Sequence, residues 1–172
     1  MRVAFASTYP PVHCGVGEYT RFLLVGLESI MPSGEYYVLA SSDVGEGYFD
    51  DAVSARVIPS FVKKDPPSFK GILDTLAEVG GVDVLHVQHE YGIFGGYEHL
   101  LEVLDEAKQE RLTKAVVVTM HSVYHPFTGR EDALVFQYGL RDHADAVIVH
   151  SIVQEFELRA QGVSPRKIYR IP

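Results

Sequence analysis

The sequence predicts an α/β fold, in which a doubly wound parallel sheet carries helices on both faces. Short apolar or β-branched runs alternate along the chain with longer segments of helical period. A parallel strand pair needs a long crossover, and such an alternation supplies one between each pair. The short runs are apolar at consecutive positions, which is typical of strands covered on both sides. We therefore expect one Rossmann-like domain spanning residues 1–172.

Six segments are predicted to form strands. They are residues 2–7, 36–40, 55–58, 83–88, 115–120 and 146–150. Residues 167–171 resemble the start of a further strand, after which the sequence stops at Pro172. We therefore expect the chain to have been cut at a domain boundary.

Four segments show the spacing of amphipathic helices. The first begins at Gly17, and its apolar stripe also includes Gly26, which is expected to pack closely on the sheet. The members of the first three stripes are Tyr19, Phe22, Leu23, Leu27 and Ile30; Phe69, Ile72, Leu73 and Leu76; and Tyr97, Leu100, Leu101 and Leu104. The fourth helix begins at Ser151, which is expected to cap it in a reciprocal capping box with Gln154.

Composition excludes several classes of function. The chain has 23 acidic and 15 basic residues, a net charge of −8, and no basic run interleaved with aromatic residues, so nucleic acid is not an expected partner. Its single cysteine, Cys14, and a start without a secretory signal indicate a cytoplasmic protein without disulfides. The apolar runs are far shorter than the roughly 20 residues of a membrane-spanning helix. Peripheral membrane contact stays open at residues 61–64, where a solvated loop is the favoured interpretation.

The loop after the first strand is the first candidate binding site, since ligands of doubly wound sheets lie beyond the carboxyl ends of the strands. It ends in Gly15, Val16 and Gly17, at the start of a helix. Glycine lets backbone approach a ligand, and a helix amino terminus offers free N–H groups to an anion such as a diphosphate. Thr20 stands where a dinucleotide fingerprint has its third glycine, so that motif is absent. A plain turn that needs glycine is the alternative.

Two further strand ends carry histidine. His89 and Glu90 follow the fourth strand and are expected to project into the crevice, and the glycines after them bring backbone close to a ligand. His121 follows the fifth strand, with Tyr124 three residues later. Because the two strands are expected to be neighbours, these residues predict a site.

A metal centre is one alternative for these residues. His86, His89, Glu90, His121 and His125 supply suitable ligand types. However, His86 and His89 lie three positions apart, which places them on opposite faces of a strand, and the usual short metal-ligand motifs are absent. We therefore expect no metal site, and His86 is more simply a core histidine.

In order along the chain, these segments resemble the retaining glycosyltransferases of family 4, which have the GT-B fold. The resemblance rests on residues 11–17, on His121 with Ser122, and on residues 147–151; residues 87–96 resemble a subgroup of that family. Residues 162–172 resemble the segment that enters the second domain. Cys14 stands where the family has a glycine, and Ser122 where it usually has an aspartate.

The resemblance implies that the chain is the amino-terminal, acceptor-side half of a GT-B enzyme whose donor-binding domain is absent here. The enzyme would transfer a sugar from a nucleotide-diphosphate sugar to a hydroxyl of a glycan, lipid or small molecule, with retention and without a cofactor or metal ion. This half alone is expected to be inactive. A nucleotide-sugar epimerase with the same fold and a non-catalytic nucleotide- or anion-binding module stay open.

The same resemblance assigns the site residues. Gly15, Val16 and Gly17 would contact the donor phosphates, and His121 would be the catalytic residue that hydrogen-bonds the transferred sugar. The acceptor side would be lined by His89, Glu90, Tyr91, Gly95, Gly96 and Tyr124. Ser151 is explained by its capping role, to which any ligand contact would be additional.

Overall fold

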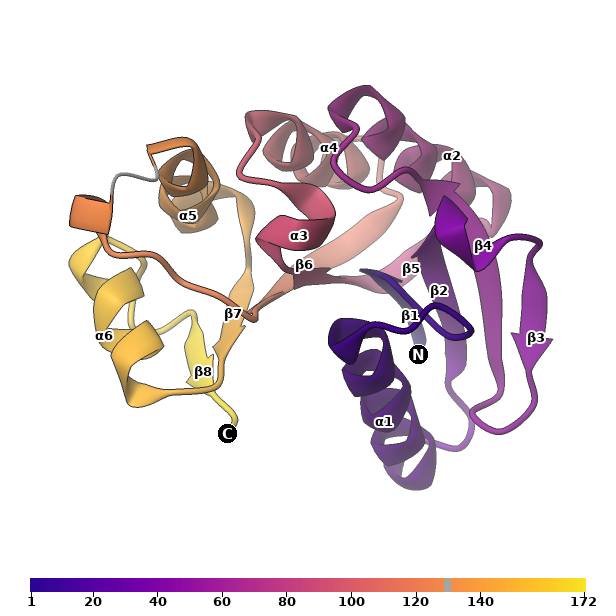
Figure 1. The fold of residues 1–172 in the computed structure, drawn as a ribbon. Helices are drawn as coiled ribbons and strands as arrows, with labels where there is room; N and C mark the ends of the chain where they lie inside the picture. Colours follow the sequence, from indigo (N-terminus) through magenta and orange to yellow (C-terminus); the bar gives the residue numbers. More distant parts are fainter. Residues whose placement is uncertain (129–130) are drawn as a thin grey trace.

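The computed structural model describes residues 1–128 and 131–172 (Figure 1). Within them the strands form one sheet in the order β3-β4-β2-β1-β5-β6-β7-β8, and only β3 runs antiparallel to its neighbour. The strands are β1 (Arg2–Ser7), β2 (Glu35–Ser41), β3 (Tyr48–Asp50), β4 (Ala55–Phe61), β5 (Val82–His89), β6 (Thr113–Met120), β7 (Ala146–Val149) and β8 (Ile168–Arg170). The predicted doubly wound fold class is confirmed.

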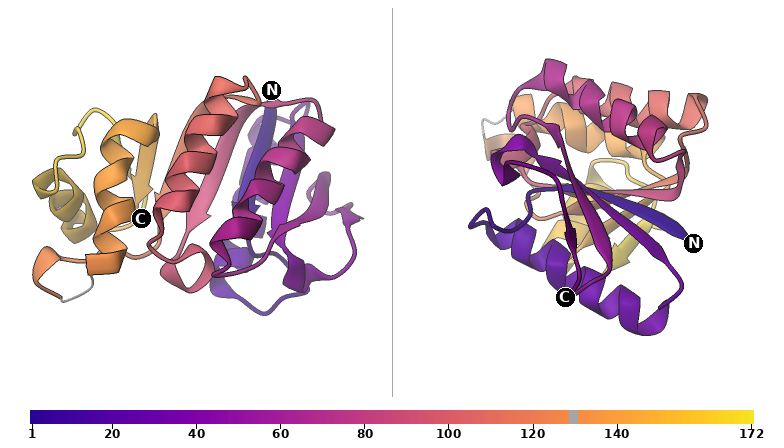
Figure 2. Two further views of the ribbon diagram at one scale, coloured as in Figure 1. Left: turned by 90° about the horizontal axis from the view of Figure 1, so that it is seen from above. Right: turned by 90° about the vertical axis from the view of Figure 1, so that its right-hand side faces the viewer.

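Helices cover both faces of the sheet, with α1 on one face and α2, α4 and α5 on the other (Figure 2). The helices are α1 (Gly15–Ile30), α2 (Gly71–Glu78), α3 (Tyr91–Phe94), α4 (Glu98–Gln109), α5 (Glu131–His143) and α6 (Ile152–Ala160). Short 3₁₀ turns are η1 (Ser42–Val44), η2 (Pro66–Lys70) and η3 (Pro126–Thr128). The crossover through α1 leads from β1 toward the β4 side of the sheet, whereas those through α2, α4 and α5 lead toward β8. Since each crossover is right-handed, opposite directions place the helices on opposite faces.

The core consists of two hydrophobic clusters, one on each face of the sheet. The α1-side cluster contains Val3 and Phe5 of β1 together with Leu24 of α1. The α4-side cluster contains Ala4 and Ala6 of β1 and buried apolar residues of α2, α4 and α5. Alternate residues of β1 thus point to opposite clusters, which is why the predicted strands are apolar at consecutive positions.

The order of winding reverses between β1 and β5, which are paired in parallel. β1 leads through α1 to β2 on one side, and β5 leads through α4 to β6 on the other. The carboxyl ends of β1, β5 and β6 therefore meet at the topological switch point, where ligands of such folds bind. We call this part of the molecule the switch-point edge.

The predicted stripe of the first helix is wrong at three positions. Phe22 and Ile30 are 69% and 73% exposed, and Gly26 lies at the surface rather than against the sheet. The buried face of α1 includes Thr20, whose hydroxyl lies 2.8 Å from that of Ser7 in β1. The buried face of α1, formed by Gly17, Thr20 and Leu24, therefore includes residues that are not part of the predicted apolar stripe.

Three elements were not predicted: β3, α3 and α5. β3 has only three residues, and α3 is a single turn inside the glycine-rich segment after β5. The buried face of α5 contains Gln137, which is 0% exposed and interrupts the apolar pattern. Polar burial and short length remove the periodicity on which such predictions depend.

No helix in the described ranges is long and apolar enough to cross a membrane. Residues 61–64, considered above for peripheral membrane contact, are exposed at Val62 and Lys64 only. Phe61 is buried and stacks on Phe94, with ring centroids 4.9 Å apart, and Lys63 pairs with Asp43 at 2.6 Å. These contacts hold Phe61 and Lys63 against the domain.

Candidate functional site

The loop between β1 and α1 is held in place by β3 and α1. The buried Tyr9 donates its hydroxyl to Oδ2 of Asp50 at 3.0 Å, and Nε of Arg21 donates to the same oxygen at 3.1 Å. The hydroxyl of Tyr48 donates to the carbonyl oxygen of Pro10. The edge strand β3 therefore anchors one wall of the switch-point edge.

Replacing Asp50 with alanine is expected to lower the free energy of unfolding by about 2–3 kcal/mol, because the buried Tyr9 hydroxyl and the Arg21 guanidinium both lose a charged partner. Urea unfolding followed by circular dichroism measures the change. Arg56→Ala is the matched control: its partner Glu78 is 3.1 Å away, both side chains are more than half exposed, and the expected loss is below about 1 kcal/mol. Equal losses for the two variants would contradict the anchoring role of Asp50.

Helix α1 begins at Gly15, two residues before the predicted start at Gly17. The first helical N–H to bond within the helix is that of Glu18, which donates to the carbonyl of Cys14 at 3.0 Å. The preceding N–H groups, those of Gly15, Val16 and Gly17, have no partner within the helix. This end of α1 can therefore donate to an anionic group.

Gly17 has a packing reason to be glycine. A Cβ atom there would lie 3.2 Å from backbone atoms of Thr8 and Tyr9, which is tighter than ordinary contact. Gly17 is buried, whereas Gly15 is exposed and Val16 half-buried. For Gly17, the turn interpretation given above therefore has direct support.

The electrostatics of this helix end favour negative charge. Burial of the Cys14 thiol opposes its ionisation, but the Thr8 hydroxyl, the N–H groups of Gly17 and Val16, and the Lys63 charge outweigh burial, so the pKa of Cys14 is lowered. The same groups would stabilise a phosphate oxygen placed there.

His89 does not project from the strand end as predicted. Its side chain is 0% exposed, its ring stacks on Phe136 at 4.0 Å, and its Nε2 lies 3.0 Å from the carbonyl oxygen of Gly95. Burial lowers the pKa of His89 to about 3. β5 continues through His89, so the alternation of the strand directs this ring into the α4-side cluster and directs Gln88 to the opposite face.

Glu90 is half-buried at the switch-point edge. Its Oε1 accepts the N–H of Tyr91 at 2.9 Å as the cap of α3, and its Oε2 accepts the Ser122 hydroxyl at 2.7 Å. Tyr91 itself is 5% exposed and donates its hydroxyl to Oε1 of Gln137 at 2.7 Å. Gly96 is buried as well. Of the predicted acceptor-side residues after β5, Glu90 and Gly95 thus retain access to the surface.

His121 is half-buried and held on several sides. Its Nε2 lies 2.9 Å from Oε1 of Gln88, and its ring packs edge-on against Tyr19, with centroids 5.0 Å apart. The ring of His150 lies 5.2 Å away. Burial, with a smaller contribution from His150, lowers the pKa of His121 to about 4 against the opposing effect of Glu90. The imidazole is therefore neutral near pH 7.

Tyr124 is half-buried in the loop after β6, and two buried glutamines hold its backbone. Gln137 accepts the Tyr124 N–H through Oε1 at 2.7 Å and donates to its carbonyl through Nε2 at 2.9 Å. Nε2 of Gln161 donates to the same carbonyl at 2.9 Å. These contacts link the loop that follows His121 to α5 and α6.

The predicted capping box of Ser151 is confirmed. The N–H of Gln154 donates to the Ser151 hydroxyl at 3.2 Å, and Oε1 of Gln154 accepts the N–H of Ser151 at 3.0 Å. Nε2 of Gln154 also donates to the carbonyl of His121 at 3.1 Å. The cap of α6 thereby supports the backbone at His121.

The structure brings His121 together with residues that sequence analysis did not assign to the site: Tyr19, Gln88 and His150. Tyr19 lies in the second turn of α1 and connects His121 with the helix whose amino terminus carries Gly15. Their contribution depends on side-chain packing across separate strands, which no single segment of the sequence reveals.

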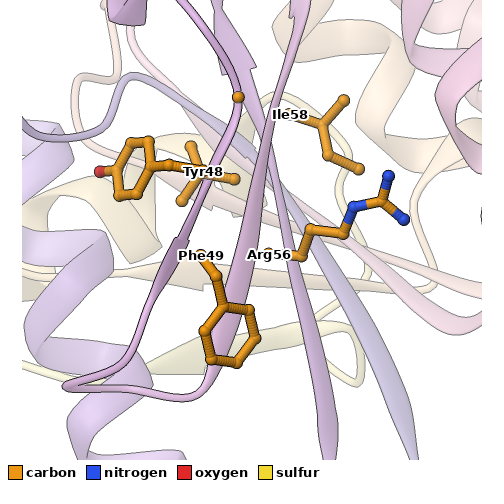
Figure 3. Close-up of a pocket in the computed structure, with 6 residues that line it drawn as sticks. Tyr48, Phe49, Arg56 and Ile58 are labelled. Carbon is orange, nitrogen blue, oxygen red and sulfur yellow. The ribbon is translucent and has the colours of Figure 1, made fainter.

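Other features do not add to this site. Within residues 1–128 and 131–172, no group of three or more histidine, cysteine, aspartate or glutamate side chains is placed to hold a metal ion. His86 is 7% exposed and bonded to Thr119, as expected of a core histidine. A hollow of about 290 Å³ lies at the far edge of the sheet, where Phe49 of β3 pairs with Arg56 of β4 (Figure 3).

Residues 15–172 match the family model of Glycosyltransferase Family 4. The chain belongs to glycosyltransferase family 4. The match includes Gly15, His121 and Ser151, and it confirms the family that the order of the motifs resembled. No curated protein matches the family 4 chain in sequence.

Solved structures share its fold at low identity. HepE of Anabaena, in complex with UDP, is 12% identical with a TM-score of 0.61, over 99% of this chain and 43% of HepE. A sucrose-phosphate synthase structure from Thermosynechococcus elongatus is 17% identical with a TM-score of 0.62, over 99% of this chain and 87% of that one. A protein of Listeria monocytogenes described as a UDP-N-acetylglucosamine 2-epimerase is 15% identical with a TM-score of 0.54, over 98% and 43%. The family 4 chain spans less than half of HepE.

Proposed function

We propose that this chain is the acceptor-side, amino-terminal half of a retaining glycosyltransferase, which moves a sugar from a nucleotide-diphosphate sugar to an acceptor hydroxyl. The observation that carries the proposal is a neutral His121 beside α1, at the switch-point edge of a family 4 chain. The likeness to HepE, which was solved with UDP and with UDP-glucose, supports a nucleotide-sugar donor.

The N–H groups at the start of α1 would stabilise the diphosphate as it departs. Charge on the leaving group grows in the transition state, so fixed donors aimed at it lower the barrier. The lowered pKa of Cys14 supports this assignment, because it reflects the same preference for negative charge. No metal ion or cofactor is needed in this proposal.

The acceptor would approach over Glu90, Gly95 and Tyr124, which line the loops after β5 and β6. Three predicted acceptor-side residues are buried and would support the shape of these loops without touching the acceptor: His89, Tyr91 and Gly96. We infer a cytoplasmic enzyme whose acceptor is a glycan, lipid or small molecule, and whose second domain completes the donor site.

A nucleotide-sugar epimerase is the second candidate, favoured by the likeness to the epimerase-like protein of Listeria monocytogenes. Both reactions begin with a nucleotide-diphosphate sugar. They differ in product, because only a transferase forms a new glycosidic bond to an acceptor.

The test is to express the gene through its natural stop codon and incubate the product with UDP- and GDP-sugars and mixed acceptors. A new glycoside with the donor's anomeric configuration, read by NMR, is the expected result. A glycoside of opposite configuration would overturn retention. An epimerised nucleotide sugar formed without acceptor would establish the epimerase, and saturable nucleotide binding without turnover would establish a binding module.

A further inference from the structure

A continuous chain of side-chain hydrogen bonds runs from the core of the sheet to His121. The hydroxyl of Thr119 lies 2.8 Å from Nε2 of His86, and the same nitrogen lies 3.4 Å from Nε2 of Gln88. Oε1 of Gln88 lies 2.9 Å from Nε2 of His121. Thr119 and Gln88 are 0% exposed and His86 is 7% exposed. Protein atoms therefore set the directions of these bonds.

The chemistry of each group orders the chain. The amide nitrogen of Gln88 only donates, so Nε2 of His86, which it faces, acts as the acceptor, and the Thr119 hydroxyl can donate to the same nitrogen. In this orientation the amide oxygen of Gln88 faces His121. An amide oxygen only accepts, so Nε2 of His121 must carry the proton.

We propose that Gln88 is a positioning residue that holds His121 in its Nε2–H tautomer and leaves Nδ1 as the acceptor offered to a substrate hydroxyl. In histidine the bond made by one ring nitrogen decides the state of the other. No described residue donates to Nδ1 of His121, so this nitrogen is available to a ligand.

The surroundings of His121 are consistent with a fixed neutral ring. His150 faces it, and Nδ1 of His150 lies 2.9 Å from the carbonyl oxygen of Ile171, which fixes that ring in turn. Tyr19 covers the edge, and Glu90 is the one carboxylate among the described residues whose charge acts on the His121 imidazole. Glu90 is already bonded to Ser122 and to the N–H of Tyr91.

The inference rests on the proposed function and makes it more specific. A bare Nδ1 recognises a hydroxyl group that donates, so the sugar hydroxyl it meets must keep its proton. Gln88 would then determine the fraction of enzyme molecules in which His121 is in the Nε2–H form.

The first experiment is an NMR measurement on the nitrogen-15 labelled chain, which reports imidazole tautomers without requiring activity. We expect the Nε2–H form for His121 in the wild type at pH 7. In Gln88→Met, which keeps the volume and removes the acceptor, both tautomers should be populated. Thr119→Val keeps its shape but no longer orients the amide through His86, and it should also release the Nδ1–H form. A wild-type His121 in the Nδ1–H form, or an unchanged tautomer in both folded variants, overturns the proposal.

The second experiment measures transfer by the full-length product. Gln88→Met is expected to lower kcat/KM in proportion to the fraction of His121 that leaves the Nε2–H form, while Gln109→Met on the exposed end of α4 changes nothing. If the wild type transfers no sugar but shows the expected tautomers, the proposed function fails and the placement of Gln88 stands. If transfer is normal in Gln88→Met, the positioning role fails and the proposed function stands.

Discussion

Replacing His121 with alanine is expected to lower kcat/KM for sugar transfer by about 100- to 1,000-fold, the usual effect of removing one group that stabilises a transition state. The loss should appear in kcat as well as in KM, because the imidazole is held by Gln88 and Tyr19 before substrate arrives. The measurement is steady-state transfer by the full-length product over a range of donor concentrations.

The matched control for this substitution is His99→Ala, since His99 is exposed on α4 and outside the site. It should retain wild-type kinetics. Because burial and His150 hold the pKa of His121 at about 4, protonation of this residue should not reduce activity between pH 8 and pH 5. Retained activity in His121→Ala, or a wild-type loss near pH 6.5 that this variant lacks, would contradict the assigned role.

Acid is expected to destabilise the domain strongly between pH 6.5 and pH 4. Burial lowers the pKa of His86 to about 4 and that of His89 to about 3, whereas both titrate near 6.5 in the unfolded chain. Below pH 6.5 the unfolded state binds protons that the folded state excludes, so stability is present above that pH and is lost as the pH falls. At pH 4.5 the two residues together remove about 5 kcal/mol relative to pH 7.

Urea unfolding at several pH values measures this loss, and His89→Phe tests its origin. Phenylalanine keeps the stack on Phe136 but does not titrate, so the loss from pH 7 to pH 4.5 should shrink by about 2.5 kcal/mol. His99→Ala removes an exposed histidine and should leave the pH dependence unchanged. If the free energy of unfolding depends on pH equally in His89→Phe and wild type, His89 is excluded as a source of acid sensitivity.

The sheet could be predicted because each long strand is apolar at consecutive positions, a local property of the sequence. The alternation of β5 was used correctly to place His86 and His89 on opposite faces of the sheet. The end of the strand was not predicted correctly: β5 extends one residue further, through His89, and this buries the His89 side chain. Gln88, one position earlier, is the residue that reaches His121. One residue of strand length therefore decided which polar side chain serves the site.

Sequence analysis found those residues of the candidate site that lie in motifs, and it missed those that side-chain packing brings to it. Gly15 and His121 follow strand ends and could be found from the topology alone. Asp50 fixes the loop of Tyr9 from a strand of three residues, and His150 reaches His121 from β7's end, so both depend on contacts between segments distant in sequence. Long-range packing of this kind leaves no periodic signal.

The pairing of β1 with β5 has a mechanical consequence for the site. The two strands are bonded in register from Val3 with Val84 to Ala6 with Val87. The loop that leads to Gly15 continues β1, and Gln88 continues β5, so both rise from one hydrogen-bonded ladder. Moving the Gly15 loop away from Gln88 would break the backbone hydrogen bonds between β1 and β5, so the spacing of the two is set before a ligand binds. This part of the candidate site is preorganised, and any movement that encloses a ligand has to come from segments outside the β1–β5 pair.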